Sequence, residues 1–169
     1  MQSDFHHLVF VDASTLINFI RIDRLELLTG CWNKLSIVEE VLSEIDYPDQ
    51  LGVLQSALDA KSIGVYRITD LSDIELGTAL YDKHGLGRGE SFSFAAAKRE
   101  KATLAIDDGR AIKLASRLVP SVPILKTQDL VVRAIQLARL TVNEADEIKE
   151  EWAAKYRFRL AFNSFSELC

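Results

Sequence analysis

The sequence predicts an α/β fold with a central, mostly parallel sheet and helices on both faces. Short apolar runs rich in β-branched residues alternate with longer segments whose apolar residues recur at helical spacing, a pattern typical of parallel sheets. The chain has 169 residues, of which 48% are hydrophobic, so it is long enough to bury a core of its own. No repeat, linker or low-complexity segment divides it. We therefore expect one domain over residues 1–169.

Three strands are predicted in the first half of the chain. The first, Leu8-Val-Phe-Val11, leads into a helix that Asp12 or Ser14 can cap and that continues at helical spacing until Gly30 ends it. Pro48 closes a later helix. The predicted strands are residues 8–11, 35–38 and 64–69, and the helices after them are residues 39–46, 51–61 and 73–84.

The second half repeats the opening pattern. After the glycine-rich Gly85-Leu-Gly-Arg-Gly89 and a helix, the apolar run Ala102–Ile106 stops at Asp107-Asp108, as the first strand stops at Asp12. The predicted strands here are residues 102–106 and 122–125, and the helices are residues 90–101, 110–118, 127–139 and 143–156. The last helix belongs to a helical extension of the same domain, residues 141–169.

Composition excludes several classes of protein. With 20 Lys and Arg against 25 Asp and Glu, the formal charge of -5 is not that of a bulk nucleic-acid binder. No run approaches the ~18 apolar residues of a membrane span, and Met1–His7 lacks the pattern of a signal peptide. Cys31 and Cys169 are far apart and are expected to be free thiols. These features predict a cytoplasmic protein without a membrane partner.

Five acidic residues are candidates for one site. Asp12 and Asp107 follow predicted strands, and in parallel sheets the binding crevice lies beyond the carboxyl ends of the strands. Asp108 is adjacent, Glu44 lies at the rim of an apolar helix stripe, and Glu90 opens a helix. Four of them also have a structural interpretation: Asp12 and Asp107 can cap helices, Glu44 can be solvated, and Glu90 can complement a helix dipole.

Taken together, these acids predict a metal site. Carboxylate oxygens suit Mg²⁺ or Mn²⁺ rather than zinc, and a cation would relieve their mutual repulsion. Such a site favours phosphodiester hydrolysis. The glycine-rich segment lacks the Lys-Ser/Thr ending of a phosphate-binding loop, and His6, His7 and His84 do not have metal-ligand spacing.

Four segments resemble, in order, the acidic motifs of PIN-domain ribonucleases. They are Val9–Ile17, Val38–Ile45, Leu86–Glu90 with the alanines behind it, and Leu104–Ala111. The resemblance extends to about residue 140. It implies a Rossmann-like α/β/α sandwich, dependence on Mg²⁺ or Mn²⁺, and RNA cleavage, often by the VapC-like toxin of a toxin–antitoxin pair.

The resemblance also implies a role for each acid. Asp12, Glu44, Glu90 and Asp107 correspond to the catalytic, metal-binding quartet, and Asp108 would be an accessory metal ligand. At the third position aspartate is more common, and Glu90 corresponds to a Gly-Glu variant of that motif. The rival interpretation is a non-catalytic PIN-like module that binds RNA or protein.

Substrate contacts are expected beside these acids. Ser14 is the hydroxyl that the family often has two places after its first aspartate. Arg88 and Arg110 flank the third and fourth motifs, with Lys113 and Arg117 further along the same predicted helix as Arg110, and such cations can contact phosphates. The expected partners are RNA, a protein antitoxin and a second copy of the chain in a homodimer.

Overall fold

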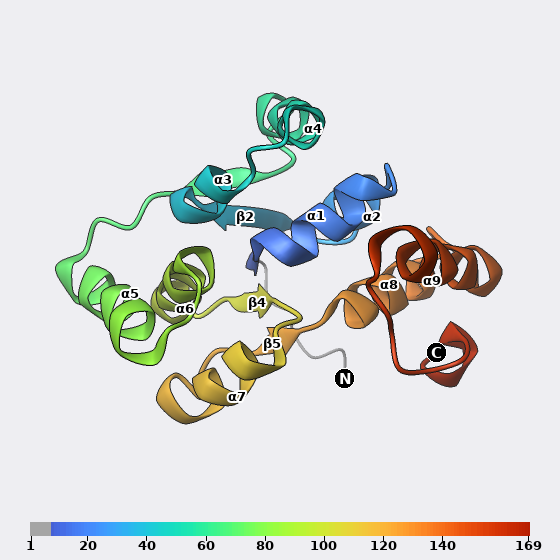
Figure 1. Cartoon of the computed structure of the whole chain (residues 1–169). Helices are drawn as coiled ribbons and strands as arrows, with labels where there is room; N and C mark the ends of the chain where they lie inside the picture. Colours follow the sequence, from blue (N-terminus) through green and yellow to red (C-terminus); the bar gives the residue numbers. More distant parts are fainter. Residues whose placement is uncertain (1–7) are drawn as a thin grey trace.

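The computed structural model describes residues 8–169 and contains a five-stranded sheet whose neighbouring strands are all parallel (Figure 1). The strands are β1 (Leu8–Val11), β2 (Lys34–Val38), β3 (Gly64–Tyr66), β4 (Thr103–Ala105) and β5 (Ile124–Leu125), in the order β3-β2-β1-β4-β5. The predicted α/β sandwich with a parallel sheet is confirmed. The strand order reverses between β1 and β4, which is where this kind of sheet forms its crevice. The features noted in Met1–His7 lie outside the described residues.

Helices cover both faces of the sheet (Figure 1). The helices are α1 (Ala13–Arg21), α2 (Glu26–Thr29), α3 (Glu39–Glu44), α4 (Pro48–Asp59), α5 (Leu71–His84), α6 (Arg88–Glu100), α7 (Gly109–Leu118), α8 (Thr127–Gln136) and α9 (Val142–Tyr156), followed by a short 3-10 helix, η1 (Phe165–Glu167). The packing of α1 on α4 forms part of one face, with α8 and α9 beside α1, whereas α5, α6 and α7 lie on the other side. None of the helices within residues 8–169 is long and apolar enough to cross a membrane.

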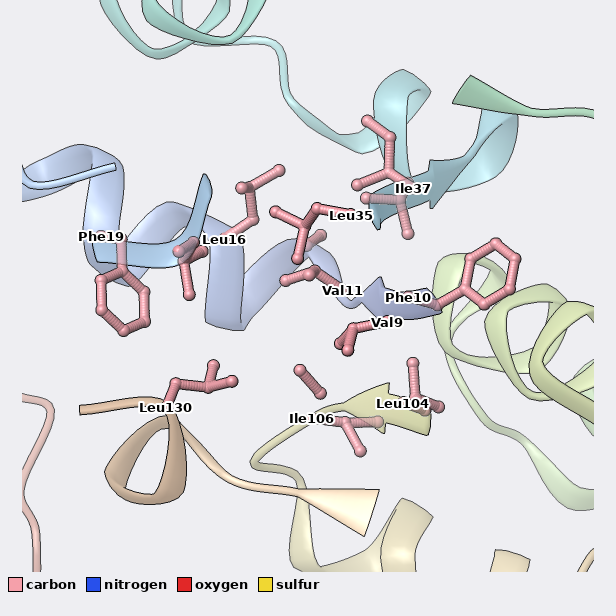
Figure 2. Close-up of a cluster of buried hydrophobic side chains, with 14 of the residues drawn as sticks. Val9, Phe10, Val11, Leu16, Phe19, Leu35, Ile37, Leu104, Ile106 and Leu130 are labelled. Carbon is pink, nitrogen blue, oxygen red and sulfur yellow. The ribbon is translucent and has the colours of Figure 1, made fainter. Parts of the chain in front are cut away.

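The core forms where the central strands meet these helices (Figure 2). Val9, Phe10 and Val11 of β1 are fully buried, which explains why this strand is continuously apolar. Phe94 of α6 is fully buried and Phe92 nearly so, as expected for aromatic residues of the core. Cys31 is buried and Cys169 exposed, and both are free thiols, as predicted.

The first predicted helix is wrong in its length. The apolar spacing predicts one helix to Gly30, but α1 ends at Arg21 and α2 begins at Glu26. Asp23 between them has a φ of 54°, a left-handed conformation that breaks a right-handed helix. The apolar period continues across the break because both helices bury their apolar residues in the same core.

Other differences concern the ends of elements. Pro48 does more than close the preceding segment: it is the first residue of α4, where its missing N–H is not needed. The third predicted strand, residues 64–69, is shorter in the structure, because only Gly64–Tyr66 pairs with β2. The last strand shortens in the same way to Ile124–Leu125.

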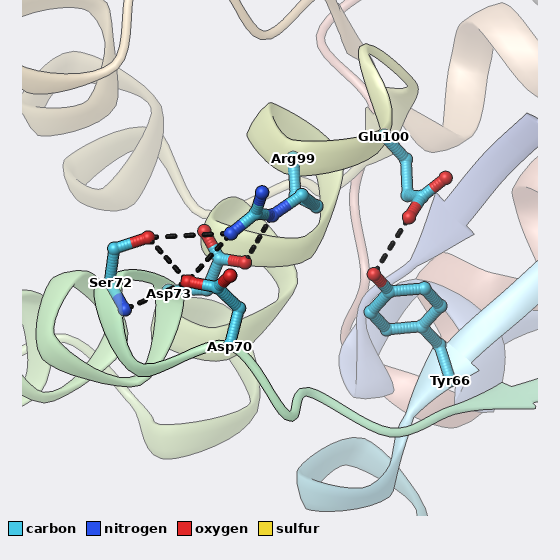
Figure 3. Close-up of polar contacts among 6 residues, drawn as sticks. All are labelled: Tyr66, Asp70, Ser72, Asp73, Arg99 and Glu100. Atoms are coloured by element: carbon cyan, nitrogen blue, oxygen red, sulfur yellow. Dashed lines mark hydrogen bonds and ion pairs between the residues drawn. The ribbon is translucent and has the colours of Figure 1, made fainter.

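Polar contacts join α5 and β3 to the end of α6 (Figure 3). The Arg99 guanidinium of α6 pairs with Asp73 at 2.5 Å and with Asp70 at 2.7 Å, and the Tyr66 hydroxyl donates to Glu100 at 2.7 Å. Burial, together with the carboxylate of Glu100, raises the pKa of Tyr66 to about 12. These bonds hold the start of α5 and the end of β3 against the C-terminal end of α6.

The C-terminal segment packs into the domain through Trp152 of α9. This residue is fully buried, its Nε1 donates to the Asn18 carbonyl of α1 at 2.8 Å, and its ring meets Phe19 and Phe158 edge-on. Asp146 of α9 in turn accepts hydrogen bonds from the start of η1. Residues 141–169 are thus tied to the helix that follows β1.

Trp152→Phe is expected to lower the free energy of unfolding by about 1–3 kcal/mol, because it leaves the buried Asn18 carbonyl without its donor. Trp32→Phe is the matched control, since the Trp32 Nε1 has no hydrogen-bond partner within the described part of the chain. It should lower the free energy of unfolding by less than Trp152→Phe does. Urea unfolding followed by circular dichroism measures both variants. A separate unfolding step for the C-terminal segment would show that α9 is not part of the cooperative unit.

Candidate metal centre

The candidate site forms at the carboxyl ends of β1 and β4. These strands are paired in register, with Val11 opposite Ala105, and the Asp12 N–H donates to the Ala105 carbonyl at 3.0 Å. Asp12 follows β1 directly and Asp107 follows β4 after one residue. The two carboxylates therefore lie at the point where the strand order reverses, as the sequence predicts.

Asp12 caps a helix and also has a carboxylate oxygen that is available to a ligand. Its Oδ2 caps α1, accepting from the Ser14 N–H at 3.1 Å and the Ser14 hydroxyl at 2.7 Å. Its Oδ1 is buried and has no hydrogen-bond partner among residues 8–169, and only 2% of the residue is exposed. A buried carboxylate oxygen without a donor is costly, so this atom requires a partner that the described residues do not supply.

Asp107 is held by two threonines that sequence reasoning did not identify. It accepts from the Thr15 hydroxyl at 3.2 Å, the Thr127 N–H at 2.9 Å and the Thr127 hydroxyl. Both threonines are fully buried. Thr127 begins α8 soon after β5, so the rule that selected Asp12 and Asp107, a polar residue following a strand, also applies to it.

Asp108 is a helix cap. Its Oδ1 accepts from the Ala111 N–H of α7 at 2.7 Å, and the side chain is exposed. The cap of α7 that the sequence suggests at Asp107 is therefore formed by Asp108 instead. The role of Asp108 as an accessory metal ligand stays a prediction.

Glu44 is the last residue of α3 and reaches the first turn of α6. Its Oε1 accepts from the Gly89 N–H at 2.7 Å. A Cβ at position 89 would lie 2.8 Å from both carboxylate oxygens of Glu44, closer than such atoms approach in proteins. Only glycine at position 89 leaves room for Glu44 in this position.

Glu90 helps to cap the N-terminus of its own helix, α6. Its Oε2 accepts from the Gly87 N–H at 2.9 Å, which satisfies a backbone donor of the first turn of α6. The side chain is half-buried. Glu90 is therefore a first-turn acid of α6, as its structural interpretation predicts, and it also lies beside the other acids.

The acids of the candidate site lie close enough together for the charge of one to raise the pKa of another. Burial raises the pKa of Asp12, and the charge of Asp107 adds to this effect. Desolvation likewise raises the pKa values of Glu44 and Glu90, with a further increase from the charge of Asp12 in both cases. The charges of Asp108 and Glu44 also raise the pKa of Glu90. All five predicted acids thus belong to one electrostatic cluster.

A PIN-domain family model, DUF3368, matches residues 8–167. The chain belongs to the PIN-domain family. No curated protein shows significant sequence similarity to it. Among solved structures, a similar chain is found in the crystal structure of VapBC2 from Rickettsia felis bound to a DNA fragment from their promoter. Identity is 16%, the TM-score is 0.48, and the match covers 70% of this chain and 98% of that one.

The acids of this PIN domain are near one another but are not drawn together into a chelating group. Within residues 8–169, no three histidine, cysteine or acidic side chains are placed so that they could already hold a metal ion. Asp12 Oδ2, Asp107, Glu44 and Glu90 are each engaged by hydrogen-bond donors instead. The donor set nonetheless fits a hard divalent cation, because it consists of carboxylate oxygens and includes the unpartnered Oδ1 of Asp12.

The predicted substrate residues of the PIN domain have different surroundings. Ser14 is exposed and donates to Asp12, so it orients that carboxylate. Arg88 is exposed at the start of α6, with its guanidinium over the Phe92 ring at 5.9 Å. Arg110, in the first turn of α7, donates to the His84 carbonyl at 3.1 Å. Of the two arginines, only Arg110 bridges two elements beside the site.

Proposed function

We propose that this PIN domain is a metal-dependent endoribonuclease that uses Mg²⁺ or Mn²⁺. The observation that carries the proposal is the buried, unpartnered Oδ1 of Asp12, at the strand reversal and within reach of the charges of Asp107, Glu44 and Glu90. Burying a carboxylate oxygen without a donor lowers the stability of the fold, and such a cost is typical of a site that binds a cation.

Asp12, Glu44, Glu90 and Asp107 would hold the metal, with Asp108 beside them. When bound, the metal would lower the pKa of an attacking water and stabilise the charge on the scissile phosphate. The protein itself orients the ligands: Thr15 and Thr127 hold Asp107, and Ser14 holds one oxygen of Asp12. Such supporting hydrogen bonds fix the ligands in the positions that the chemistry requires.

The direct test is cleavage of single-stranded RNA by the purified protein. We expect cleavage with Mn²⁺ or Mg²⁺ and its loss with a chelator. An RNA that carries a fluorophore and a quencher at its two ends reports internal cleavage. RNA binding without cleavage under any of these conditions would contradict the enzyme and favour a non-catalytic binding module.

We further propose that the enzyme is the toxin of a toxin–antitoxin pair, on the basis of its sequence resemblance to VapC-like PIN domains. Expression of the chain alone should then arrest bacterial growth, and the Glu90→Gln variant should not. Equal amounts of both proteins, checked by immunoblot, make the comparison valid. Normal growth with an enzyme that is active in vitro would instead indicate a nuclease that is not a toxin.

A further inference from the structure

A cationic groove on α7 lies next to the candidate metal centre. Three exposed basic residues, Arg110, Lys113 and Arg117, follow one another at helical spacing on this helix. Together with His84, Gly109 and Leu114 they line a surface cavity of about 460 Å³, which we call the α7 groove. None of the described residues that line it is acidic.

The cations of the groove form no ion pairs within the part of the chain that the structure describes. Within residues 8–169, neither Arg110, Lys113 nor Arg117 forms an ion pair with a carboxylate. Arg110 donates to the His84 carbonyl, a neutral acceptor, rather than to a carboxylate of the described residues. The chain has a formal charge of -5, so three cations on one helix face form a positive patch on a protein of net negative charge. Such a patch attracts anionic ligands.

The α7 groove adjoins the candidate metal centre at the start of α7. Arg110 is two residues from Asp108, the cap of α7, and His84 is the last residue of α5, just before the glycine-rich segment that leads to Glu90. From Arg110 to Arg117 the helix rises about 10 Å. A nucleic-acid strand carries one charge per ~3.4 Å when stacked, so this length is sufficient for more than one phosphate.

We propose that the α7 groove binds the sugar–phosphate backbone of the single-stranded RNA substrate and leads it to the acidic centre. This inference rests on the proposed function and extends it, because it assigns the path of the substrate to Arg110, Lys113 and Arg117 rather than to Arg88. The contacts are to phosphates, so they position the strand without reading its sequence.

The test measures RNA binding by the Asp12→Asn protein, which keeps the RNA intact. Fluorescence anisotropy at several salt concentrations gives the slope of log K against log salt. Lys113→Gln with Arg117→Gln should weaken binding to RNAs of different sequence alike and reduce the slope by roughly 1.4, since each lost phosphate contact on a single strand contributes about 0.7.

The matched control removes one lysine and one arginine elsewhere. Lys34→Gln with Arg159→Gln changes the net charge equally. Lys34 lies at the amino end of β2, whereas the candidate site lies at the carboxyl ends of the strands, and Arg159 follows α9. This control should leave the slope unchanged. Thermal melts of all variants verify that they are folded, and single-stranded DNA of the same sequence separates a preference for ribose from general phosphate binding.

The outcomes separate the two proposals. If the wild type cleaves RNA but the groove variant keeps the full salt slope, the groove is not the RNA path and the proposed enzyme stands. If the groove variant loses slope but the wild type does not cleave, the groove binds RNA and the enzyme is contradicted. Binding of polyglutamate in preference to RNA would overturn the inference and indicate an acidic protein partner.

Discussion

Asp12→Asn is expected to reduce metal-dependent RNA cleavage by roughly 10²–10³-fold, the size of effect produced by losing one preorganised electrostatic group from an active site. The substitution keeps the shape of the side chain, and an amide oxygen can still accept from Ser14 at the start of α1. It removes the charge that the unpartnered Oδ1 carries. Cleavage assays with Mn²⁺ measure the effect, and activity equal to the wild type would contradict the assigned site.

The same variant should be more stable than the wild type when metal is removed. Burial raises the pKa of Asp12 above its ordinary value of 3.8, so the folded state holds this proton more tightly than the unfolded chain does. The charge therefore costs stability as the pH rises above about 4, and the full cost is reached above the raised pKa. At pH 7 with a chelator, Asp12→Asn removes this cost, and its melting temperature should exceed that of the wild type.

With bound metal, the wild type should instead have the higher melting temperature of the two proteins. A divalent ion at a hundredfold excess over its Kd adds about 2.7 kcal/mol to the stability of the native state. For a domain of this size, that gain is a rise of roughly 5–10 °C in melting temperature. The wild type should show this gain with Mn²⁺, and Asp12→Asn should lose most of it. Equal gains in both proteins would show that Asp12 is a cap alone.

Asp70→Asn is the matched control, because Asp70 caps α5 just as Asp12 caps α1. It accepts from the Ser72 N–H at 2.9 Å and from the Ser72 hydroxyl at 2.6 Å. Asp70 is exposed, and these hydrogen bonds lower its pKa, so its charge stabilises the folded state above the unfolded pKa and this contribution is lost as the pH falls. At pH 7 Asp70→Asn should therefore lower the melting temperature, the opposite sign to Asp12→Asn without metal, and leave cleavage unchanged.

The comparison of Asp12 with Asp70 shows what the sequence can predict about the site. Each is an aspartate two places before a serine and caps a helix, so the local pattern alone does not distinguish them. The difference comes from the preceding residues. Asp12 follows a buried apolar strand and Asp70 does not, and because parallel strands end at one edge, Asp12 is predicted to meet Asp107.

Other parts of the site depend on packing that no local pattern encodes. Asp107 resembles Asp12 in the sequence, yet Thr15 and Thr127 satisfy it with hydrogen bonds, from elements that the fold alone brings together. The same limit applies to the break at Asp23, since the apolar period continues through it. Periodicity reports which residues are buried, and it does not report where the backbone leaves the helix.

Gly89→Ala is expected to lower metal-dependent cleavage by roughly 10–100-fold, the usual effect of disturbing a residue that positions a metal ligand. The added methyl group would lie 2.8 Å from the carboxylate oxygens of Glu44, and the flexible end of that side chain is what must move. Movement also breaks the hydrogen bond from the Gly89 N–H. Stability should change little, because alanine suits the first turn of a helix and Glu44 can turn toward solvent.

Two comparisons separate this mechanism from a general effect of adding a methyl group to a helix. Gly52→Ala in α4 is the matched control, since no atom of residues 8–169 lies within 4 Å of a Cβ at that position. It should raise the free energy of unfolding by about 0.5–1 kcal/mol without changing cleavage. The second comparison is a double-mutant cycle with Glu44→Ala. If Gly89 acts by holding Glu44, the double variant is no less active than Glu44→Ala alone, because the side chain that the methyl group displaces is already absent. Additive losses would instead mean that Gly89 contributes independently of Glu44, through its own backbone or through the approach of the RNA.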